Sequence, residues 1–199
     1  MTTIIDYGAG NLFSVRNALN YLGYENQISS DKSDIISADR LILPGVGAFG
    51  DAMEKLRGSG LIDVIKQEAV KKPFLGICLG MQLLFEESHE FGQHKGLGLI
   101  PGTVKLMKPN DDLSIPQMGW NSLEFNHPCP LLNGISEDEY VYFVHSYAAD
   151  CSDSYVSAYT DYGGRVTALV SSGTVFGAQF HPEKSGETGL NILKNFAEL

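Results

Sequence analysis

The residue best suited to chemistry in this chain is Cys78, at the centre of Gly76-Ile77-Cys78-Leu79-Gly80. Apolar residues lie on both sides of it, so we expect a buried strand to end at Cys78 and a helix to begin there. The two glycines lack the Cβ atoms that would obstruct so sharp a turn. The positive end of a helix favours the nucleophilic thiolate. The alternative is that Cys78 packs as a small hydrophobic residue.

A candidate base for this nucleophile lies far downstream, in His181-Pro182-Glu183. The apolar segment 175–180 before it is expected to be a buried strand. Residues two apart in extended chain point to the same side, so Glu183 is placed to orient the His181 ring and stabilise its charged form. A nucleophile, a base and an orienting acid make up a catalytic triad. A histidine at a strand end can instead be structural, but the coincidence of both motifs favours catalysis.

A third motif, Pro44-Gly45-Val46-Gly47, follows the apolar run 41–43. Its glycines allow the backbone to turn N–H groups toward a ligand. Such donors near Gly45, Val46 and Gly47, with the amide of Leu79 after the nucleophile, form a candidate oxyanion hole for a tetrahedral intermediate. The alternative is an ordinary turn between a strand and a helix.

The elements that must position these motifs alternate along the chain and predict an α/β fold with a mostly parallel central sheet flanked by helices. The expected strands of this part are 3–7, 24–28, 40–43 and 74–77, and the expected helices are 12–22, 48–57, 61–71 and 79–88. Short alternating segments then predict antiparallel strands, some of which join the first sheet: 104–107, 122–125, 140–144, 155–159, 166–171 and 175–180, before a closing helix over 186–199. All three motifs follow strands, and sites in open α/β sheets lie at the carboxyl ends of strands.

Composition narrows the class of protein further. The 199 residues are 43% hydrophobic, enough for one substantial core, and we expect a single domain over 1–199. The net charge of −10 argues against nucleic acid or an anionic membrane as a partner. Three cysteines without a CxxC motif argue against a disulfide framework or a zinc site and favour a reducing cytoplasm. The N-terminus lacks the basic and apolar regions of a signal peptide, and no segment has the length of a membrane span.

These motifs resemble those of the class I, or triad-type, glutamine amidotransferases. The residues that carry the resemblance are Gly-Ile-Cys-Leu-Gly-Met-Gln at 76–82, Pro-Gly-Val-Gly at 44–47 and Gln-Phe-His-Pro-Glu-Lys-Ser at 179–185. Segments 6–12, 116–121 and 142–147 resemble the narrower family of glutaminase subunits of imidazole glycerol phosphate synthase, in histidine biosynthesis. The resemblance covers essentially the whole chain. It implies hydrolysis of L-glutamine by Cys78, His181 and Glu183, without a metal or other cofactor.

The resemblance also implies which residues contact glutamine. The glutamine of the family that matches Gln82 binds the substrate, and Gln82 lies one helical turn beyond Cys78 on the same face. Backbone groups around Gly47 and the segment His145-Ser146-Tyr147 are implied as further contacts. From the residues alone, Gln82 is equally a solvent-facing helix residue and His145 a satisfied core histidine.

Ammonia released in water is mostly protonated and no longer nucleophilic, and the chain shows no nucleotide-binding motif for an acceptor. We therefore expect a partner subunit, which the resemblance identifies as a (βα)8-barrel cyclase in a heterodimer. The expected interface residues are Asn11, Trp120, Asn121, Tyr142 and Lys184. Trp120 is the only tryptophan and a candidate anchor, with burial in the core as the alternative. Lys184 is a candidate partner for a carboxylate on the barrel, or simply a solvated lysine.

Three other readings stay open on the sequence. The chain can be the glutaminase of another triad amidotransferase, such as that of anthranilate, aminodeoxychorismate or pyridoxal phosphate synthesis. It can be a stand-alone cysteine hydrolase of similar α/β shape. It can also be a non-catalytic interaction subunit in which Cys78 only packs.

Overall fold

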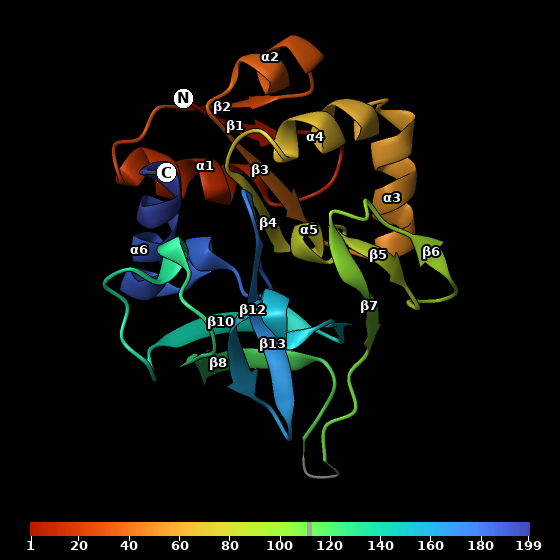
Figure 1. Cartoon of the computed structure of the whole chain (residues 1–199), viewed down its shortest axis with the longest axis vertical. Helices are drawn as coiled ribbons and strands as arrows, with labels where there is room; N and C mark the ends of the chain where they lie inside the picture. The colour runs from red at the N-terminus through yellow and green to blue at the C-terminus, as the bar shows by residue number, and fades with distance from the viewer. Residues whose placement is uncertain (111–112) are drawn as a thin grey trace.

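The computed structural model describes residues 1–110 and 113–199, and its core is a twisted central sheet (Figure 1). In this part of the chain the sheet has eight strands in the order β2-β1-β3-β4-β14-β13-β12-β9. Its parallel strands are β1 (Thr2–Ile5), β2 (Asn26–Ser29), β3 (Arg40–Gly45), β4 (Phe74–Cys78) and β14 (Val175–Ala178). The antiparallel strands β13 (Arg165–Ser172), β12 (Val156–Asp161) and β9 (Glu124–Phe125) extend one side of it. The expected α/β class is confirmed, and later strands do join the first sheet.

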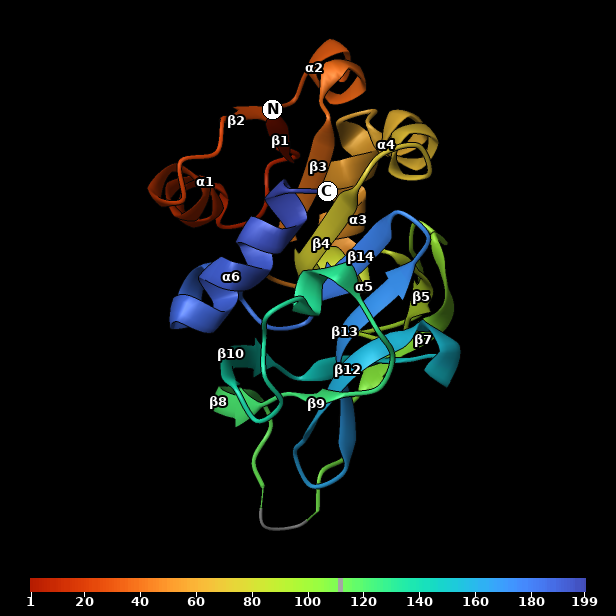
Figure 2. The same cartoon turned by 60° about the vertical axis from the view of Figure 1, so that its left-hand side comes forward.

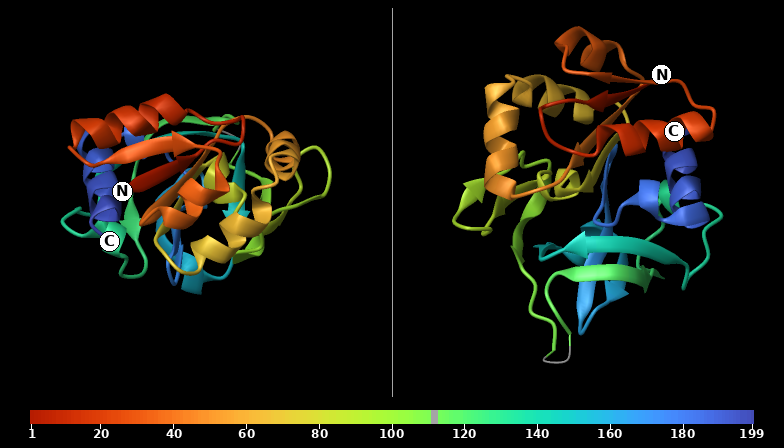
Figure 3. Two further views of the ribbon diagram at one scale, coloured as in Figure 1. Left: turned by 90° about the horizontal axis from the view of Figure 1, so that it is seen from above. Right: turned by 180° about the vertical axis from the view of Figure 1, so that it is seen from behind.

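Helices cover both faces of the parallel strands (Figures 1 and 3). On one face lie α1 (Leu12–Tyr21) and α6 (Gly186–Ala197), and on the other α3 (Phe49–Gly58) and α4 (Ile62–Ala69). Neighbouring strand residues alternate between the two layers, since Ile4 packs with the α1 side and Ile5 with the α3 side. A short helix, α2 (Lys32–Ser37), follows β2. No helix among the described residues is long and apolar enough to cross a bilayer.

Two smaller sheets lie beyond the carboxyl ends of the parallel strands (Figure 2). One pairs β8 (Gln117–Ser122) with β10 (Tyr140–His145) in antiparallel register. The other contains β11 (Tyr147–Asp150), β7 (Ile100–Leu106), β5 (Phe85–Ser88) and β6 (His94–Lys95). Three single-turn 3-10 helices complete the described elements: η1 (Pro130–Leu132), η2 (Asp153–Tyr155) and η3 (Pro182–Lys184).

The helix expected over 79–88 is wrong beyond its first turn. Helix α5 spans only Leu79–Gln82, and Phe85–Ser88 form the strand β5 instead. The backbone of this segment is held by residues later in the chain: Leu97 donates to the Leu83 carbonyl and Gly96 to the Glu86 carbonyl, both at 2.8 Å. Strand pairing with β7 thus overrides a local apolar pattern that fits either a helix or a strand.

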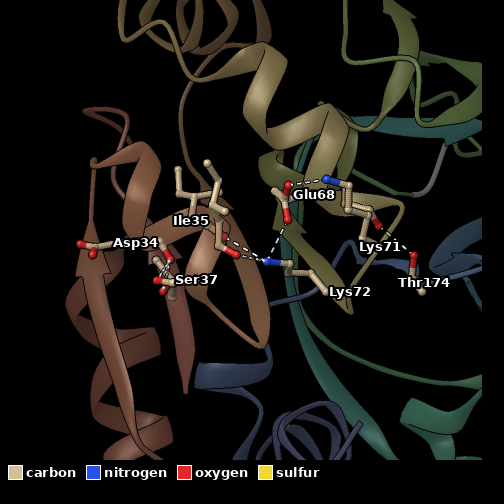
Figure 4. Close-up of polar contacts among 10 residues, drawn as sticks. Asp34, Ile35, Ser37, Glu68, Lys71, Lys72 and Thr174 are labelled. Atoms are coloured by element: carbon tan, nitrogen blue, oxygen red, sulfur yellow. Dashed lines mark hydrogen bonds and ion pairs between the residues drawn. The ribbon is translucent and has the colours of Figure 1, made fainter.

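An ion cluster around the buried Glu68 carboxylate joins α2 to the end of α4 (Figure 4). The Glu68 carboxylate is nearly inaccessible to solvent and contacts Lys71 Nζ at 2.8 Å and Lys72 Nζ at 2.9 Å. Lys72 also donates to the carbonyls of Ile36 at 2.6 Å and Ile35 at 3.3 Å, in the last turn of α2. Hydrogen bonds from Lys71 and Lys72 outweigh burial and lower the pKa of Glu68.

We expect Lys72→Met to lower the free energy of unfolding by about 2 kcal/mol, because it leaves Glu68 half-paired and the end of α2 uncapped. Lys66→Met, at an exposed position of α4, is the control and should change stability by less than about 0.5 kcal/mol. Since the folded pKa of Glu68 lies below its ordinary 4.5, its contribution is present above that pH and disappears as the pH falls through the folded value. Urea titrations at pH 7 and pH 3 test this. An equal Lys72→Met effect at both pH values would contradict it.

Candidate active site

Three neighbouring parallel strands bring the three motifs to one edge of the sheet. Strand β4 lies between β3 and β14, and Gly45 at the end of β3 is directly opposite Cys78. Ala178, the last residue of β14, follows the register partner of Gly76 and lies opposite Ile77. His181 comes shortly after β14, so its imidazole reaches the same edge as the Cys78 thiol. This is the edge at which open α/β sheets bind ligands.

The turn at Cys78 is a strained strand-to-helix elbow. Cys78 itself has φ of 54° and ψ of −112°, in a region that residues other than glycine rarely adopt. A Cβ on Gly76 would lie 2.5 Å from the Gly80 carbonyl oxygen, and one on Gly80 would lie 1.8 Å from the Leu43 carbonyl oxygen. Both glycines are therefore required for close backbone packing. The helix that follows is a single turn, so its dipole is weaker than we expected for the helix 79–88.

His181 and Glu183 form a buried ion pair next to Cys78. His181 Nδ1 lies 2.8 Å from Glu183 Oε1, and both side chains are almost fully inaccessible to solvent. Burial alone lowers the pKa of His181, but the neighbouring Cys78 and Glu183 groups outweigh burial and raise it to about 9. His181 Nε2 is not aligned for a hydrogen bond with any described group, as is common before substrate binds. Glu183 therefore holds the imidazole through Nδ1 and leaves Nε2 free.

We expect the His181 imidazole to titrate with a midpoint near pH 9, and His145 to titrate near pH 4. Because the folded pKa of His181 lies above the ordinary 6.5, its charged form stabilises the fold fully below 6.5, and that stabilisation disappears as the pH rises through 9. NMR of the histidine ring protons measures both midpoints. Cys78→Ala should lower the His181 midpoint. A wild-type His181 midpoint near 6.5 would contradict the ion pair.

The candidate oxyanion segment is anchored at its first residue. The Tyr7 hydroxyl donates to the Pro44 carbonyl at 3.0 Å, and burial, with the charge of Cys78, raises the pKa of Tyr7. Gly45 packs so closely on the start of α5 that a Cβ would lie 2.7 Å from the Gly80 nitrogen. Gly47 has φ of +100° and open space around it, whereas Gly45 has neither. The segment is thus fixed at Gly45 and free of packing constraints at Gly47.

A cavity of about 330 Å³ opens beside the Cys78 sulfur. Cys78 and His181 line it, together with each residue expected to contact glutamine: Gly47, Gln82, His145, Ser146 and Tyr147. Val46 and Leu79 of the candidate oxyanion hole line it as well. Within residues 1–110 and 113–199, no group of three or more His, Cys, Asp or Glu side chains is arranged to hold a metal ion.

His145 is a neutral acceptor at the wall of this cavity. Its Nδ1 lies 2.9 Å from the Tyr147 carbonyl, which can only accept, so Nδ1 carries the proton. Burial lowers the pKa of His145 to about 4. Its Nε2 is buried and has no hydrogen-bond partner among the described residues. The expectation of a satisfied core histidine therefore holds for only one of the two ring nitrogens.

Sequence reasoning missed the acidic residue of the cavity, Glu90. Its Oε2 accepts a hydrogen bond from the Phe49 amide at 2.6 Å, where α3 begins, and the residue also lines the cavity. Pro116 and Val144 are further lining residues that were not predicted. Glu90 lies in the loop after β5, two residues beyond the end of the expected helix 79–88. Nothing in its local sequence indicated that it would line this cavity.

Of the expected interface residues, Trp120 and Asn121 lie on β8 and Tyr142 on β10, whereas Lys184 lies in η3 and Asn11 directly precedes α1. Trp120 lies opposite Tyr142, their rings 5.9 Å apart in edge contact, and Trp120 is 52% exposed, so the alternative of a core tryptophan is wrong. Tyr142 is tied to the triad segment, because its carbonyl accepts from the His181 amide at 3.0 Å. Lys184 is exposed and Asn11 half-buried. Asn121 is half-buried and accepts a hydrogen bond from Gln117 at 3.0 Å.

The elbow at Cys78 and the buried His181–Glu183 pair lie together at the carboxyl edge of the sheet, as the three motifs predict. A family model described as glutamine amidotransferase class-I matches residues 3–199. The chain therefore belongs to the class-I glutamine amidotransferase family, and the family predicted from the three motifs is confirmed.

Curated relatives narrow the comparison. The chain is 53% identical over 197 residues to imidazole glycerol phosphate synthase subunit HisH of Bacillus cereus (strain G9842), with 98% of this chain and 93% of the relative covered. It is 48% identical over 200 residues to the subunit of the same name from Listeria monocytogenes serotype 4b (strain CLIP80459), with 100% and 96% covered. Two solved structures share the fold: a glutamine amidotransferase (TM-score 0.75, 20% identity, 99% of both chains) and PurLQS from Thermotoga maritima (TM-score 0.74, 24% identity, 99% and 97%).

Proposed function

We propose that this chain is the glutaminase subunit of an imidazole glycerol phosphate synthase. The observation that carries the proposal is the cavity in which Cys78 and the buried His181–Glu183 pair meet the residues expected to contact glutamine. The identity of about half of all residues to curated subunits of that synthase supports the narrower assignment.

In the proposed first half-reaction, the Cys78 thiolate attacks the side-chain amide carbon of glutamine. Backbone amides from Gly45 to Gly47 and from Leu79 hold the oxyanion of the tetrahedral intermediate. The His181 imidazolium gives its proton to the departing nitrogen, the C–N bond breaks, and ammonia leaves. Glu183 keeps the imidazolium oriented and charged. The product on the enzyme is a γ-glutamyl thioester of Cys78.

In the second half-reaction, neutral His181 takes a proton from water, and the resulting hydroxide attacks the thioester carbon. The C–S bond breaks, glutamate leaves, and the thiolate–imidazolium pair is restored. The remaining cavity groups suit the amino-acid end of the substrate. Glu90 brings negative charge to the cavity for an ammonium, and neutral His145 offers an acceptor nitrogen.

The ammonia must reach its acceptor without protonation, which requires a docked partner. The exposed face of the β8–β10 sheet is apolar beside the site, with Met118 64% and Tyr140 58% exposed next to Trp120. We propose that this face, with Asn11, Asn121, Tyr142 and Lys184, docks the (βα)8-barrel cyclase subunit. The barrel combines ammonia with a phosphoribulosyl aminoimidazole-carboxamide nucleotide and makes imidazole glycerol phosphate and an aminoimidazole carboxamide ribonucleotide.

Interface substitutions test this surface. Trp120→Ala should weaken association with the barrel tenfold or more, since buried aromatics dominate interface energies. Val70→Ala removes a side chain that is 64% exposed at the amino end of β4, far from the site, and is the control. Equal affinities for both variants would place the interface elsewhere.

Glutaminase turnover of the chain alone, with the barrel, and with the barrel plus nucleotide tests the whole proposal. We expect slow hydrolysis alone and faster hydrolysis at each step, on the proposal that the Gly45–Val46 peptide turns its N–H toward the oxyanion only in the complex with bound nucleotide. Equal rates in all three would refute this switch and leave the triad intact. Failure to bind the barrel would instead favour the glutaminase of another triad amidotransferase, and hydrolysis of other amides without any partner would favour a stand-alone hydrolase.

A further inference from the structure

A chain of polar contacts runs from the Tyr147 carbonyl to the Cys78 sulfur through two buried amides. Gln82 Nε2 lies 2.9 Å from the Tyr147 carbonyl oxygen and 3.0 Å from Gln179 Oε1. Gln179 Nε2 lies 3.9 Å from Cys78 Sγ. Gln179 is completely buried and Gln82 nearly so. Buried amides are retained where their hydrogen bonds are made, so this arrangement calls for an explanation.

The direction of this chain follows from its first member. A backbone carbonyl can only accept, so Gln82 must present its amide nitrogen to Tyr147. The second N–H of that nitrogen then donates to Gln179, which must present its oxygen. The Gln179 nitrogen is thereby left facing Cys78 as a donor. If the side-chain amide of Gln82 or Gln179 were flipped, two donors or two acceptors would face each other.

Two consequences follow for the atoms that face the cavity. Both donors of Gln82 are used internally, and its Oε1 accepts no hydrogen bond from the described residues. Since Gln82 lines the cavity, the group that it offers to a ligand is an acceptor. At the other end, the sulfur receives an N–H donor, and donors to the charged form of a group favour that form.

We propose that Gln179 is a positioning residue: it donates to the Cys78 sulfur in favour of the thiolate and holds Gln82 with its oxygen toward the substrate. The part of this inference that concerns the substrate rests on the proposed glutaminase function. The backbone of Gln179, two residues before His181, is fixed by a hydrogen bond. Its amide donates to the Ala168 carbonyl of β13 at 2.9 Å. His181 and Gln179 thus approach the sulfur from the same short segment that follows β14.

The test is the pH dependence of Cys78 alkylation by iodoacetamide, followed on the Cys78 peptide by mass spectrometry. Gln179→Glu replaces the donor by a carboxylate, and Gln179→Leu removes it. We expect the alkylation midpoint to rise by about one pH unit in Gln179→Glu and by less in Gln179→Leu. The ionisable groups near the sulfur or the cavity, Tyr7, Glu90, His145, His181 and Glu183, are the same in all variants.

Kinetics in the complex separate the two functions of Gln179. We expect kcat/KM for glutamine to fall about a hundredfold in Gln179→Glu. In Gln82→Leu, KM should rise, and the alkylation midpoint should rise by less than in Gln179→Glu, because Gln179 loses the contact that orients its amide. Gln27→Glu, in the edge strand β2 where Gln27 donates to Thr3, is the control and should change neither quantity.

A wild-type alkylation midpoint in either folded Gln179 variant would overturn the proposal. If neither Gln179 variant folds, a wild-type alkylation midpoint in Gln82→Leu would overturn it instead, because the loss of the contact that orients Gln179 should disturb its donation to the sulfur. The alkylation readout uses no glutamine. Failure of glutaminase activity in the wild-type complex would therefore count against the proposed function and not against this inference.

Discussion

Cys78→Ala should reduce glutamine hydrolysis in the complex by a thousandfold or more. The substitution removes the only atom that can form the thioester, and members of a triad act as a unit, so His181 and Glu183 cannot compensate. The measurement is glutamate release by the complex under saturating glutamine. Synthesis from added ammonium salts should persist, because it bypasses the glutaminase site.

Cys151→Ala is the matched control for this experiment. Cys151 is half-buried and lies outside the cavity, and burial raises the pKa of its thiol to about 11. Its removal should leave both activities near wild type. A Cys78→Ala complex that hydrolyses glutamine at a rate close to wild type would end the proposed mechanism.

Gly80→Ala should lower the free energy of unfolding by at least about 3 kcal/mol. The new Cβ would lie 1.8 Å from the Leu43 carbonyl oxygen, and backbone of β3 cannot move aside as a flexible side chain could. Any relief must shift α5 away from β3, which displaces Cys78 from His181. We therefore expect glutaminase activity to fall even under conditions in which the variant stays folded.

Gly58→Ala provides the comparison. Gly58 is the last residue of α3, and a Cβ there meets nothing within 4 Å. Alanine should leave stability unchanged or raise it by about 0.5 kcal/mol. Urea titrations of both variants measure the difference. Equal stabilities would show that the elbow can accept a side chain at Gly80.

Each candidate catalytic residue could be predicted from the sequence because the pattern that indicates it is local. Cys78 and His181 each follow an apolar strand, and parallel neighbours end at the same edge of a sheet. Glu183 is two residues from His181, so their contact needs no long-range information. The sequence could not show that the two strands are adjacent. That adjacency comes from the sheet order, in which β14 inserts beside β4.

The errors arose where long-range pairing decides the structure. The segment 83–88, apolar only over 83–85, fits a helix or a strand, and its contacts with residues 94–104 make its second part β5. The strand β11, which pairs with β7, was not predicted for the same reason, and the short helix α2 was not predicted either. Glu90 and Gln179 were not predicted as site residues, since a loop glutamate and a strand-end glutamine have no local pattern that indicates a cavity.

Identification of the covalent species during turnover tests the central claim most directly. The complex is quenched in acid while it hydrolyses glutamine, digested, and mapped by mass spectrometry. We predict a γ-glutamyl thioester on the peptide that contains Cys78, absent from Cys78→Ala and accumulating if deacylation is slowed. Steady hydrolysis with the γ-glutamyl group on another residue, or with none trapped on Cys78 under conditions that preserve thioesters, would contradict the account.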